Sequence, residues 1–452
     1  MAFARYDLIV VGAGSGLDVA VAAAEHGMKV ALVEEGPMGG TCLNRGCIPS
    51  KILIQSAETM EEISRAGLFG IGVKGVSADF RKIMARARRV DKEAAQIEAN
   101  IRKGKALTLY KERAAFSGMK ALKVKAGEIT ADKIVIAAGS RPAIPKVEGL
   151  GKVKFMTSDD ALRAKALPER LIILGGGYIA AEFAHFFGSL GSKITILQRN
   201  SRLLPNEDEQ VSQMFTDLFA QKYDVRLGFR ISSVKAKGDE IICTGDDGSE
   251  ARGTCLLVAT GRIPNTDILR VEKTGVKVDA RGFVQADEFL ETSVKGIWTL
   301  GDIAGRYMFK HSANMEARAV FNNLVHPDSL RKADYTAMPH AVFSSPQVAG
   351  AGATEQELRE KKEHYIASHY HYGSTAMGGA MEAHSGIVKF ITDHNGAILG
   401  CHIIGPHASV LIHEVLVAMR AGLRADEIAE TVHIHPSLSE VVERAAASAG
   451  PD

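Results

Sequence analysis

The stretch that decides the fold is YDLIVVGAGSG, residues 6–16, in which an apolar run leads directly into closely spaced glycines. The apolar residues are rich in β-branched side chains and are typical of a buried strand. Residues 17–27, LDVAVAAAEHG, have a helical composition and end at Gly27, and KVALVEE (29–35) predicts a second strand. The sequence therefore begins with a strand–helix–strand unit that carries a glycine turn at its first junction.

The same pattern returns at residues 170–199, RLIILGGGYIAAEFAHFFGSLGSKITILQR. Two such units predict an α/β chain with two Rossmann-like dinucleotide-binding domains. Three further strands, each ending in a glycine-containing loop, are predicted by IVIAAGSRPAIP (134–145), CLLVATGRIPN (255–265) and IWTLGDIAG (297–305). We also expect one amphipathic helix over residues 81–90.

The pattern changes near residue 335. The segments AVFSSPQVAGAG, GIVKFITD and ILGCHIIG predict antiparallel strands, and SVLIHEVLVAMRAG predicts a helix, so this part is an α+β domain. The expected domains are 1–145, which binds the first nucleotide, 146–268, which binds the second, 269–334, which is central and completes the first site, and 335–452.

The composition excludes several classes of protein. The chain has 452 residues, of which 46% are hydrophobic and 24% charged, and its net charge is only +2. This balance gives no electrostatic case for nucleic acid or an anionic membrane. No apolar run approaches the ~18 residues of a membrane span, and the beginning lacks the layout of a signal peptide. With only 5 cysteines, the protein is expected in a reducing cytoplasm.

The first glycine turn fits a dinucleotide pyrophosphate. Gly12 and Gly14 supply the tight turn and the close backbone approach, but Leu17 occupies the third position, where a small residue is usual. The neighbouring Gly16 is expected to compensate for Leu17. Glu34, at the end of the second predicted strand, can accept hydrogen bonds from both hydroxyls of a ribose that lacks a 2′-phosphate.

The second glycine turn has Gly175, Gly177 and the small Ala180 at the corresponding positions. Gln198 occupies the position of the ribose carboxylate, and Arg199 follows it. The guanidinium of Arg199, with no carboxylate at position 198, favours binding of a ribose 2′-phosphate. This pattern therefore predicts NADPH in preference to NADH. The alternative is that Arg199 is solvated and Gln198 hydrogen-bonds an unmodified ribose.

Two cysteines lie close together in GGTCLNRGCIPSK, residues 39–51. Cys42 and Cys47 do not make a zinc site, because a structural site needs four ligands and no second pair is present; we expect no metal. A redox disulfide is the better interpretation, with Cys42 facing a substrate and Cys47 facing an electron donor. A helix beginning near Cys47 would favour its thiolate. Cys243, Cys255 and Cys401 are interpreted as buried small hydrophobes.

These motifs resemble the flavoprotein (pyridine nucleotide) disulfide oxidoreductases over nearly the whole chain. The segments GGTCLNRGCIPSK, IVIAAGSRP, LVATGRIPN, LGDIAG and HPSLSE occur in the order of that family. The resemblance implies FAD in the first site, NADP (preferred) or NAD in the second, and a homodimer that shares each active site across its interface. It implies that the 335–452 domain is the dimerisation domain.

The resemblance also implies roles for individual residues. Cys47 would be the thiol beside the flavin, and Cys42 the thiol that exchanges with substrate. Lys51 and Glu182 would pair near the flavin, and Tyr178 would gate the nicotinamide. The remaining FAD contacts implied are Ser15, Gly40, Thr41, Ala114, Ala138, Gly139, Ser140, Asp302 and His311, and the remaining NAD(P) contacts are Ile179 and Gly261.

The last motif, HIHPSLSE, holds a candidate acid/base pair. His435 and Glu440 are five residues apart, and a histidine held by a carboxylate is a tuned general acid or base. The family resemblance places His435 next to Cys42 of the partner subunit. His433 is interpreted as a packing or interface histidine.

The substrate stays open at this point. The cysteine motif resembles the dihydrolipoamide dehydrogenases, which exchange electrons with a lipoyl dithiol. The segment 170–199, KHSANMEAR and AMGGAMEAHSGIVKFI resemble the mycothione reductases, which suggests instead an NADPH-dependent reductase of a small thiol disulfide of mycothione, glutathione or glutamylcysteine type. A flavin-binding redox sensor without turnover is a further alternative, against which the His435–Glu440 pair argues.

Overall fold

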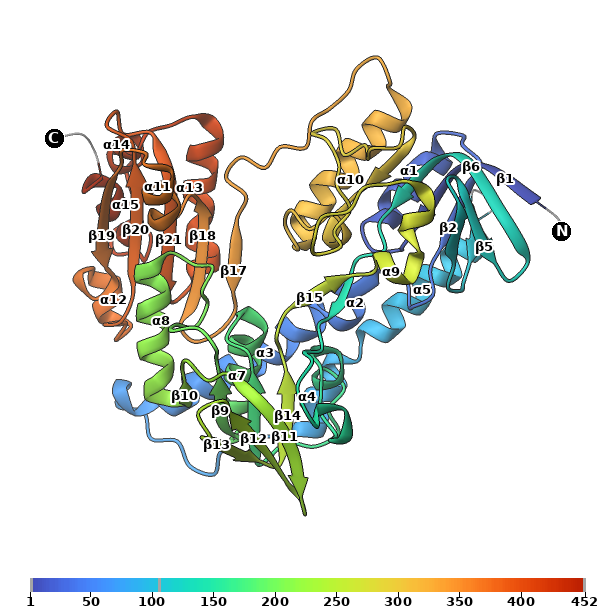
Figure 1. Ribbon diagram of the computed structural model, residues 1–452. Helices are drawn as coiled ribbons and strands as arrows, with labels where there is room; N and C mark the ends of the chain where they lie inside the picture. Colours follow the sequence, from blue (N-terminus) through green and yellow to red (C-terminus); the bar gives the residue numbers. More distant parts are fainter. Residues whose placement is uncertain (1–2, 105–106, 450–452) are drawn as a thin grey trace. The chain divides into compact units, whose positions relative to one another are not determined.

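A computed structural model describes residues 3–104 and 107–449, and the chain divides into two compact units (Figure 1). The first comprises Met1–Ile52, Met84–Ala143 and Gly261–Tyr335. The second comprises Leu53–Ile83, Ile144–Thr260 and Thr336–Asp452. Each unit is thus assembled from segments that are far apart in the sequence.

The first unit is built on a seven-stranded sheet of order β3-β2-β1-β6-β5-β4, with β16 paired to β6. Strands β1, β2, β3, β6 and β16 run parallel. Strand β1 is buried on both faces, because Leu8 and Val10 pack in one apolar cluster while Ile9 and Val11 pack in another. The elements are β1 (Phe3–Val11), α1 (Gly16–Glu25), β2 (Val30–Val33), α2 (Gly40–Arg45), α5 (Val90–Lys103), β3 (Leu107–Tyr110), β4 (Ala115–Gly118), β5 (Ala121–Val124), β6 (Gly127–Ile136), β7 (Ser140–Pro142), β15 (Arg262–Pro264), α9 (Thr266–Leu269), η3 (Val271–Thr274), β16 (Ile297–Thr299), η4 (Gly301–Ile303) and α10 (Lys310–Val325).

The second unit contains a parallel sheet of order β10-β9-β8-β14 and an antiparallel sheet of order β11-β12-β13. Helix α7 (Tyr178–Ser189) follows β8 (Arg170–Leu174) and leads to β9 (Lys193–Leu197), which repeats the strand–helix–strand unit of the first sheet. The other elements of this part are α3 (Cys47–Arg65), which begins in the first unit, η1 (Ala66–Phe69), α4 (Phe80–Ala87), η2 (Leu150–Lys152), α6 (Ser158–Ala161), α8 (Glu209–Lys222), β10 (Asp224–Arg226), β11 (Ile231–Lys237), β12 (Glu240–Gly245), β13 (Glu250–Gly253) and β14 (Cys255–Val258).

The rest of the second unit is a five-stranded antiparallel sheet of order β17-β18-β21-β20-β19. One face is covered by α13 and α15, which share an apolar cluster with Val388 and Phe390 of β20. The elements are β17 (His340–Val342), β18 (Gln347–Gly352), α11 (Glu355–Lys361), β19 (Ile366–His371), η5 (Tyr372–Ser374), α12 (Ala376–Ala380), β20 (Ile387–Thr392), β21 (Ile398–Gly405), α13 (Ala408–Ala421), α14 (Ala425–Glu430) and α15 (Glu440–Ala447).

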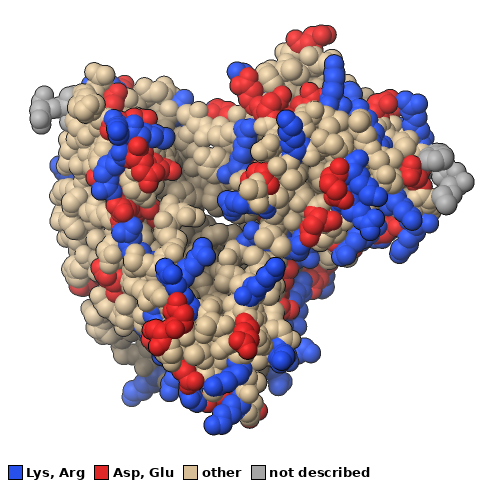
Figure 2. Space-filling model, viewed as in Figure 1, with Lys and Arg blue, Asp and Glu red and all other residues tan. Residues whose placement is uncertain are grey.

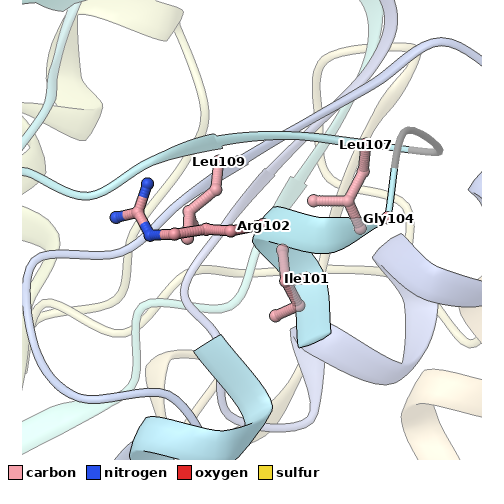
Figure 3. A pocket seen from close by; sticks show the side chains of 5 residues that line it. All are labelled: Ile101, Arg102, Gly104, Leu107 and Leu109. Carbon is pink, nitrogen blue, oxygen red and sulfur yellow. The ribbon is translucent and has the colours of Figure 1, made fainter. Parts of the chain in front are cut away.

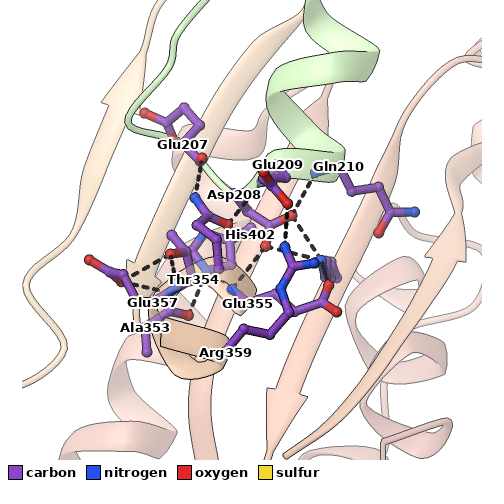
Figure 4. Close-up of polar contacts among 12 residues, drawn as sticks. Glu207, Asp208, Glu209, Gln210, Ala353, Thr354, Glu355, Glu357, Arg359 and His402 are labelled. Atoms are coloured by element: carbon purple, nitrogen blue, oxygen red, sulfur yellow. Dashed lines mark hydrogen bonds and ion pairs between the residues drawn. The ribbon is translucent and has the colours of Figure 1, made fainter. Parts of the chain in front are cut away.

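The other face of this sheet carries a buried polar network at the start of helix α8 (Figure 4). Lys389 of β20, whose side chain is only 3% exposed, donates to both oxygens of the fully buried Asp208 at 2.9 and 3.0 Å. Lys389 also pairs with Glu355 at 2.5 Å, and Asp208 caps α8 by accepting from the N–H of Gln210. This network joins the second nucleotide-binding segment to the antiparallel sheet.

The predicted α/β class and the two strand–helix–strand units are confirmed. The predicted helix over 81–90 was wrong in extent, because α4 ends at Ala87 and a new helix, α5, begins at Val90. The strand predicted from AVFSSPQVAGAG is two strands, β17 and β18, separated by residues 343–346. Within residues 3–104 and 107–449, no helix combines the length and apolar character that a membrane span requires.

Candidate functional site

The first glycine turn leaves an open cradle at the end of β1. Gly12 has φ +106°, and a Cβ there would lie 2.3 Å from the carbonyl oxygen of Ala137, so the turn itself requires glycine. Gly14 is different, because a Cβ there would meet nothing within 4 Å. Gly16 takes over the packing role expected at position 17, since a Cβ on Gly16 would lie 2.8 Å from the Ala137 side chain. The Leu17 departure therefore leaves close helix–strand packing intact.

Polar groups surround this cradle. The carboxylate of Glu34, just after β2, accepts hydrogen bonds from the N–H groups of Ala13 (2.7 Å) and Gly36 (2.6 Å). The hydroxyl of Ser15 donates to Asn314 and accepts from Lys310, each at 2.9 Å. A helix start, an open glycine and a nearby cation suit the pyrophosphate of a dinucleotide.

Further polar groups line the ends of β6, β7 and β16 in the same unit. The Ser140 hydroxyl donates to Asp302 at 2.6 Å and accepts from Arg262 at 2.7 Å. The loop before Asp302 is held by the fully buried Glu316, which accepts from the N–H of Gly301 at 2.6 Å and from the Tyr335 hydroxyl at 2.8 Å. Burial raises the pKa of Glu316. The remaining residues predicted to contact FAD, namely Gly40, Thr41, Lys51, Ala114, Ala138, Gly139 and His311, belong to this first unit as well.

The two cysteines lie on consecutive helices. Cys42 is in the short helix α2, and Cys47 begins the 19-residue helix α3. A Cβ on Gly46 would lie 2.8 Å from the carbonyl oxygen of Thr41, so the turn between the helices requires glycine. The Cys47 thiol lies at the positive end of the α3 dipole, which favours its thiolate.

Both cysteines are thiols in this structure, with Cys42 half-buried and Cys47 exposed. The expectation that Cys47 faces an electron donor and Cys42 a substrate stays a prediction. A hydrogen bond with Cys47 raises the pKa of Cys42, and burial and the charge of Cys47 act in the same direction, whereas the Lys310 ammonium lowers it. Its environment therefore favours the protonated form of Cys42.

The second glycine turn has the same construction. Gly175 has φ +118°, and a Cβ there would lie 2.3 Å from the carbonyl oxygen of Ala259, whereas a Cβ on Gly177 would meet nothing within 4 Å. Gly177 is the residue that precedes helix α7. Tyr178 and Ile179 lie in the first turn of α7, and Tyr178 is 39% exposed. The open glycine again fits a pyrophosphate at a helix N-terminus.

The residues after β9 differ in exposure. Gln198 is buried, and its amide lies beneath the turn, where a Cβ on Gly176 would come within 2.7 Å of the Gln198 nitrogen. The Gln198 amide donates to the Arg202 carbonyl at 3.2 Å, while Arg199 is exposed. Glu182, on α7, is buried and accepts from the N–H of Phe343 at 3.1 Å.

His435 and Glu440 form the expected pair. Nδ1 of His435 lies 2.8 Å from Oε1 of Glu440, and Oε2 of Glu440 accepts from the N–H of Ser437 at 2.9 Å. The bond to His435, together with that from Ser437, holds the pKa of Glu440 below its usual range. The His435 ring is 71% exposed, and its neighbours Val432 and Ile434 are 96% and 78% exposed. His435 therefore lies in an exposed, partly apolar segment at the surface of its own chain.

The predicted site residues divide between the two units. The FAD set, the cysteines, Lys51 and Gly261 belong to the first unit, and the other NAD(P) residues, Glu182, His435 and Glu440 belong to the second. The Lys51–Glu182 pairing joins different units and stays a prediction. Sequence reasoning missed Lys310 and Glu316, although both lie in the motif FKHSANMEA that contains His311.

Two other surface features of the described residues do not coincide with these predicted sites. On the face shown in Figure 2, basic and acidic side chains are interspersed. A pocket of about 220 Å³ is lined by Ile101, Arg102, Gly104, Leu107 and Leu109 (Figure 3). None of the predicted site residues lines it. Among the described residues, no group of three or more His, Cys, Asp or Glu side chains is arranged to hold a metal ion.

Comparisons with known proteins agree with this architecture. Residues 6–317 match the family model of the pyridine nucleotide-disulphide oxidoreductases, and residues 338–446 match the dimerisation domain of that family. The chain is 39% identical to mycothione reductase of Mycobacterium tuberculosis over 456 residues, covering 97% of this chain and 98% of that protein. It is 34% identical to dihydrolipoyl dehydrogenase of Chlorobaculum parvum, covering 99% of this chain and 97% of that one.

Among solved structures, the fold is similar to that of the HOCl-induced flavoprotein disulfide reductase RclA from Escherichia coli. The TM-score is 0.87 at 28% identity, with 98% of this chain and 99% of that chain covered. The chain belongs to the pyridine nucleotide-disulphide oxidoreductase family. It is a flavoprotein oxidoreductase that acts on sulfur groups, its cofactors are FAD and NAD(P), and it forms a homodimer through its dimerisation domain.

Proposed function

We propose that this protein is an NADPH-dependent reductase of a low-molecular-weight thiol disulfide. The choice of coenzyme rests on the difference in exposure between the two residues that follow β9. Gln198 is buried and engaged with the Arg202 carbonyl, whereas Arg199 is exposed. No ion pair or side-chain hydrogen bond of Arg199 is found in residues 3–104 and 107–449. A guanidinium in that position suits a 2′-phosphate.

The cysteines and the acid/base pair supply the sulfur chemistry. FAD, when bound at the first glycine turn, would supply the redox chemistry that links the nicotinamide coenzyme to the Cys42–Cys47 disulfide. In the reduced dithiol, His435 of the partner subunit takes the proton of Cys42, and the Cys42 sulfur attacks the substrate disulfide. The first substrate thiol leaves with the proton from His435. The Cys47 thiolate then attacks the Cys42 sulfur of the mixed disulfide, which breaks the bond to the substrate and restores the Cys42–Cys47 disulfide. The second substrate sulfur leaves as a thiolate and takes its proton from water.

A dihydrolipoyl dehydrogenase that runs these steps in reverse is the second candidate. The motif GGTCLNRGCIPSK favours it, as does 34% identity to a protein of that name. The 39% identity to a mycothione reductase favours the first candidate. Both use the same dithiol and acid/base pair, so substrate, coenzyme and reaction direction separate them.

Steady-state assays of each coenzyme against lipoamide and several small disulfides test the proposal. We expect NADPH with a small disulfide to give the highest kcat/KM. Turnover restricted to NADH and lipoamide would establish the second candidate instead. Failure of every disulfide, in a protein that binds FAD, would leave the redox-sensor alternative.

The residue roles have separate tests. Arg199→Ala should weaken NADPH about tenfold or more, because a hydrogen bond to a charged group contributes ~1.5–3 kcal/mol, while NADH serves as the matched control. Equal losses for both coenzymes would overturn the assignment. After uptake of two electrons, the wild type should show long-wavelength absorption from the Cys47 thiolate beside the oxidised flavin. Cys42→Ser has no disulfide and should show this band without reduction, whereas Cys47→Ser should not show it in either state. Retention of the band in Cys47→Ser would reverse the two cysteine roles.

A further inference from the structure

A second histidine–carboxylate pair lies two residues from His435. Nε2 of His433 faces Oε2 of Glu414, on helix α13, at 3.5 Å, and the His433 side chain is only 8% exposed. Nδ1 of His433 lies 2.7 Å from the carbonyl oxygen of Thr431. Among the described residues, the other oxygen of Glu414 is buried without a hydrogen-bond partner. The Glu414 carboxylate, whose side chain is 33% exposed, therefore faces a histidine that the sequence indicated to be a packing or interface residue.

The His433 ring is the one buried side chain in an otherwise exposed run from Val432 to Pro436. Before it, Thr431 is fixed to the end of helix α14 through its hydroxyl, which donates to the Glu427 carbonyl at 2.9 Å. After it, the next hydrogen bonds are those from the His435 ring and the N–H of Ser437 to Glu440. The backbone that leads into His435 is therefore fastened to the domain through His433.

The contact with Thr431 fixes the orientation of the His433 ring. Because the Thr431 carbonyl can only accept, Nδ1 of His433 must donate. Nε2 is then the ring nitrogen that faces the Glu414 carboxyl group at 3.5 Å. Burial raises the pKa of Glu414, while the neighbouring His433 opposes that shift.

We propose that His433 and Glu414 form a polar anchor that positions the acid/base residue His435. This inference rests on the proposed function, since it matters only if His435 moves protons for the thiols. His433 and Glu414 are positioning residues, because they act through the backbone that carries His435 and contact no substrate. The anchor holds the backbone that carries His435, and the exposed ring of His435 is directed at the partner subunit.

The test uses the FAD-containing dimer and separates the two halves of turnover. The kcat/KM for NADPH reports the reduction of the enzyme, which does not need His435, and the kcat/KM for the disulfide reports the half that does. In Glu414→Ala and His433→Phe, we expect the disulfide kcat/KM to fall about ten- to hundredfold, as misplacement of a reacting group does. The NADPH kcat/KM should stay within about twofold of wild type, because reduction of the enzyme does not need a correctly placed His435.

Conservative and matched variants give the controls. Glu414→Gln keeps the shape and can donate to a neutral Nε2, so it should restore the disulfide kcat/KM to within about threefold of wild type. His364→Phe alters an exposed histidine of the same domain that lies against His394, and should change neither constant. Dimer content and thermal midpoint are measured for every variant.

Comparison with His435→Ala distinguishes failure of the proposed anchor from failure of the proposed reductase function. If His435→Ala abolishes disulfide turnover while Glu414→Ala and His433→Phe leave it intact, the anchor is refuted and the proposed function stands. If His435→Ala itself is harmless, the proposed function fails first. A parallel fall in both constants, or no rescue by Glu414→Gln, would assign the pair a merely structural role and overturn the inference.

Discussion

The buried Lys389–Asp208 pair makes a quantitative prediction about stability. In Lys389→Met, the chain loses the ammonium that donates to both oxygens of Asp208, a side chain with no exposed surface. The carboxylate keeps its hydrogen bonds from the N–H groups of Gln210 and Glu355 at 3.1 and 3.2 Å. It is then a buried charge with only backbone partners.

The expected magnitude follows from the cost of such a charge. Removing one member of a buried pair costs about 3–5 kcal/mol, and the remaining backbone bonds place this case near 3 kcal/mol. Unfolding entropy near 60 °C is ~2.1 cal/mol/K per residue, which is ~0.95 kcal/mol/K for a chain of this length. Lys389→Met should therefore lower the thermal midpoint by about 3 °C.

The assay is calorimetry of the FAD-containing dimer at one scan rate and one protein concentration. The matched control is Lys82→Met, whose ammonium is 86% exposed and 3.7 Å from Asp79, so its midpoint should move by less than about 1 °C. Asp208→Asn added to Lys389→Met removes the stranded charge and should recover about half of the loss. A Lys389→Met midpoint equal to that of Lys82→Met, or strictly additive single changes, would refute this reasoning.

Three further predictions concern the Asp208 carboxylate and the two glycine turns. Burial opposes ionisation of Asp208, but its bonds to Lys389 outweigh that and lower its pKa, so the stabilisation is complete above the unfolded value of ~3.9. It is lost as pH falls through the folded pKa, and the midpoints of wild type and Lys389→Met should converge below about pH 4. Gly12→Ala should destabilise even the FAD-free protein, whereas Gly14→Ala should keep that stability and lose FAD, as measured by flavin absorbance per chain. Gly177→Ala should likewise keep the fold and weaken NADPH binding, as measured by titration; unchanged affinity would show that the coenzyme does not approach that turn.

Much of the fold was predictable because its signals are local. The strand–glycine–helix pattern predicted both parallel sheets, since such turns require a positive φ that glycine alone adopts at little cost. The His435–Glu440 pair was also predictable, because five residues of chain determine that contact. The break between α4 and α5 was missed because the amphipathic period continues through it.

Contacts between distant segments could not be derived from one sequence. Glu316 reaches Gly301 through the packing of α10 against the loop before Asp302, and Glu414 meets His433 only because α13 and the last loop fold together. One signal was available: Lys389 is the single charge inside GIVKFIT, and a lone charge in an apolar strand requires a buried partner. The identity of that partner, Asp208, depends on tertiary structure.

The same lysine also determines how strand β20 pairs. All six residues of β20 are buried, so hydrophobicity does not distinguish its two faces, and a shift by one residue would exchange them at little apolar cost. Such a shift would move Lys389 from the carboxylates of Asp208 and Glu355 into the apolar layer formed with α13 and α15. The ion pair therefore specifies the register of β20, because a register shifted by one residue would leave Lys389 and Asp208 buried without each other.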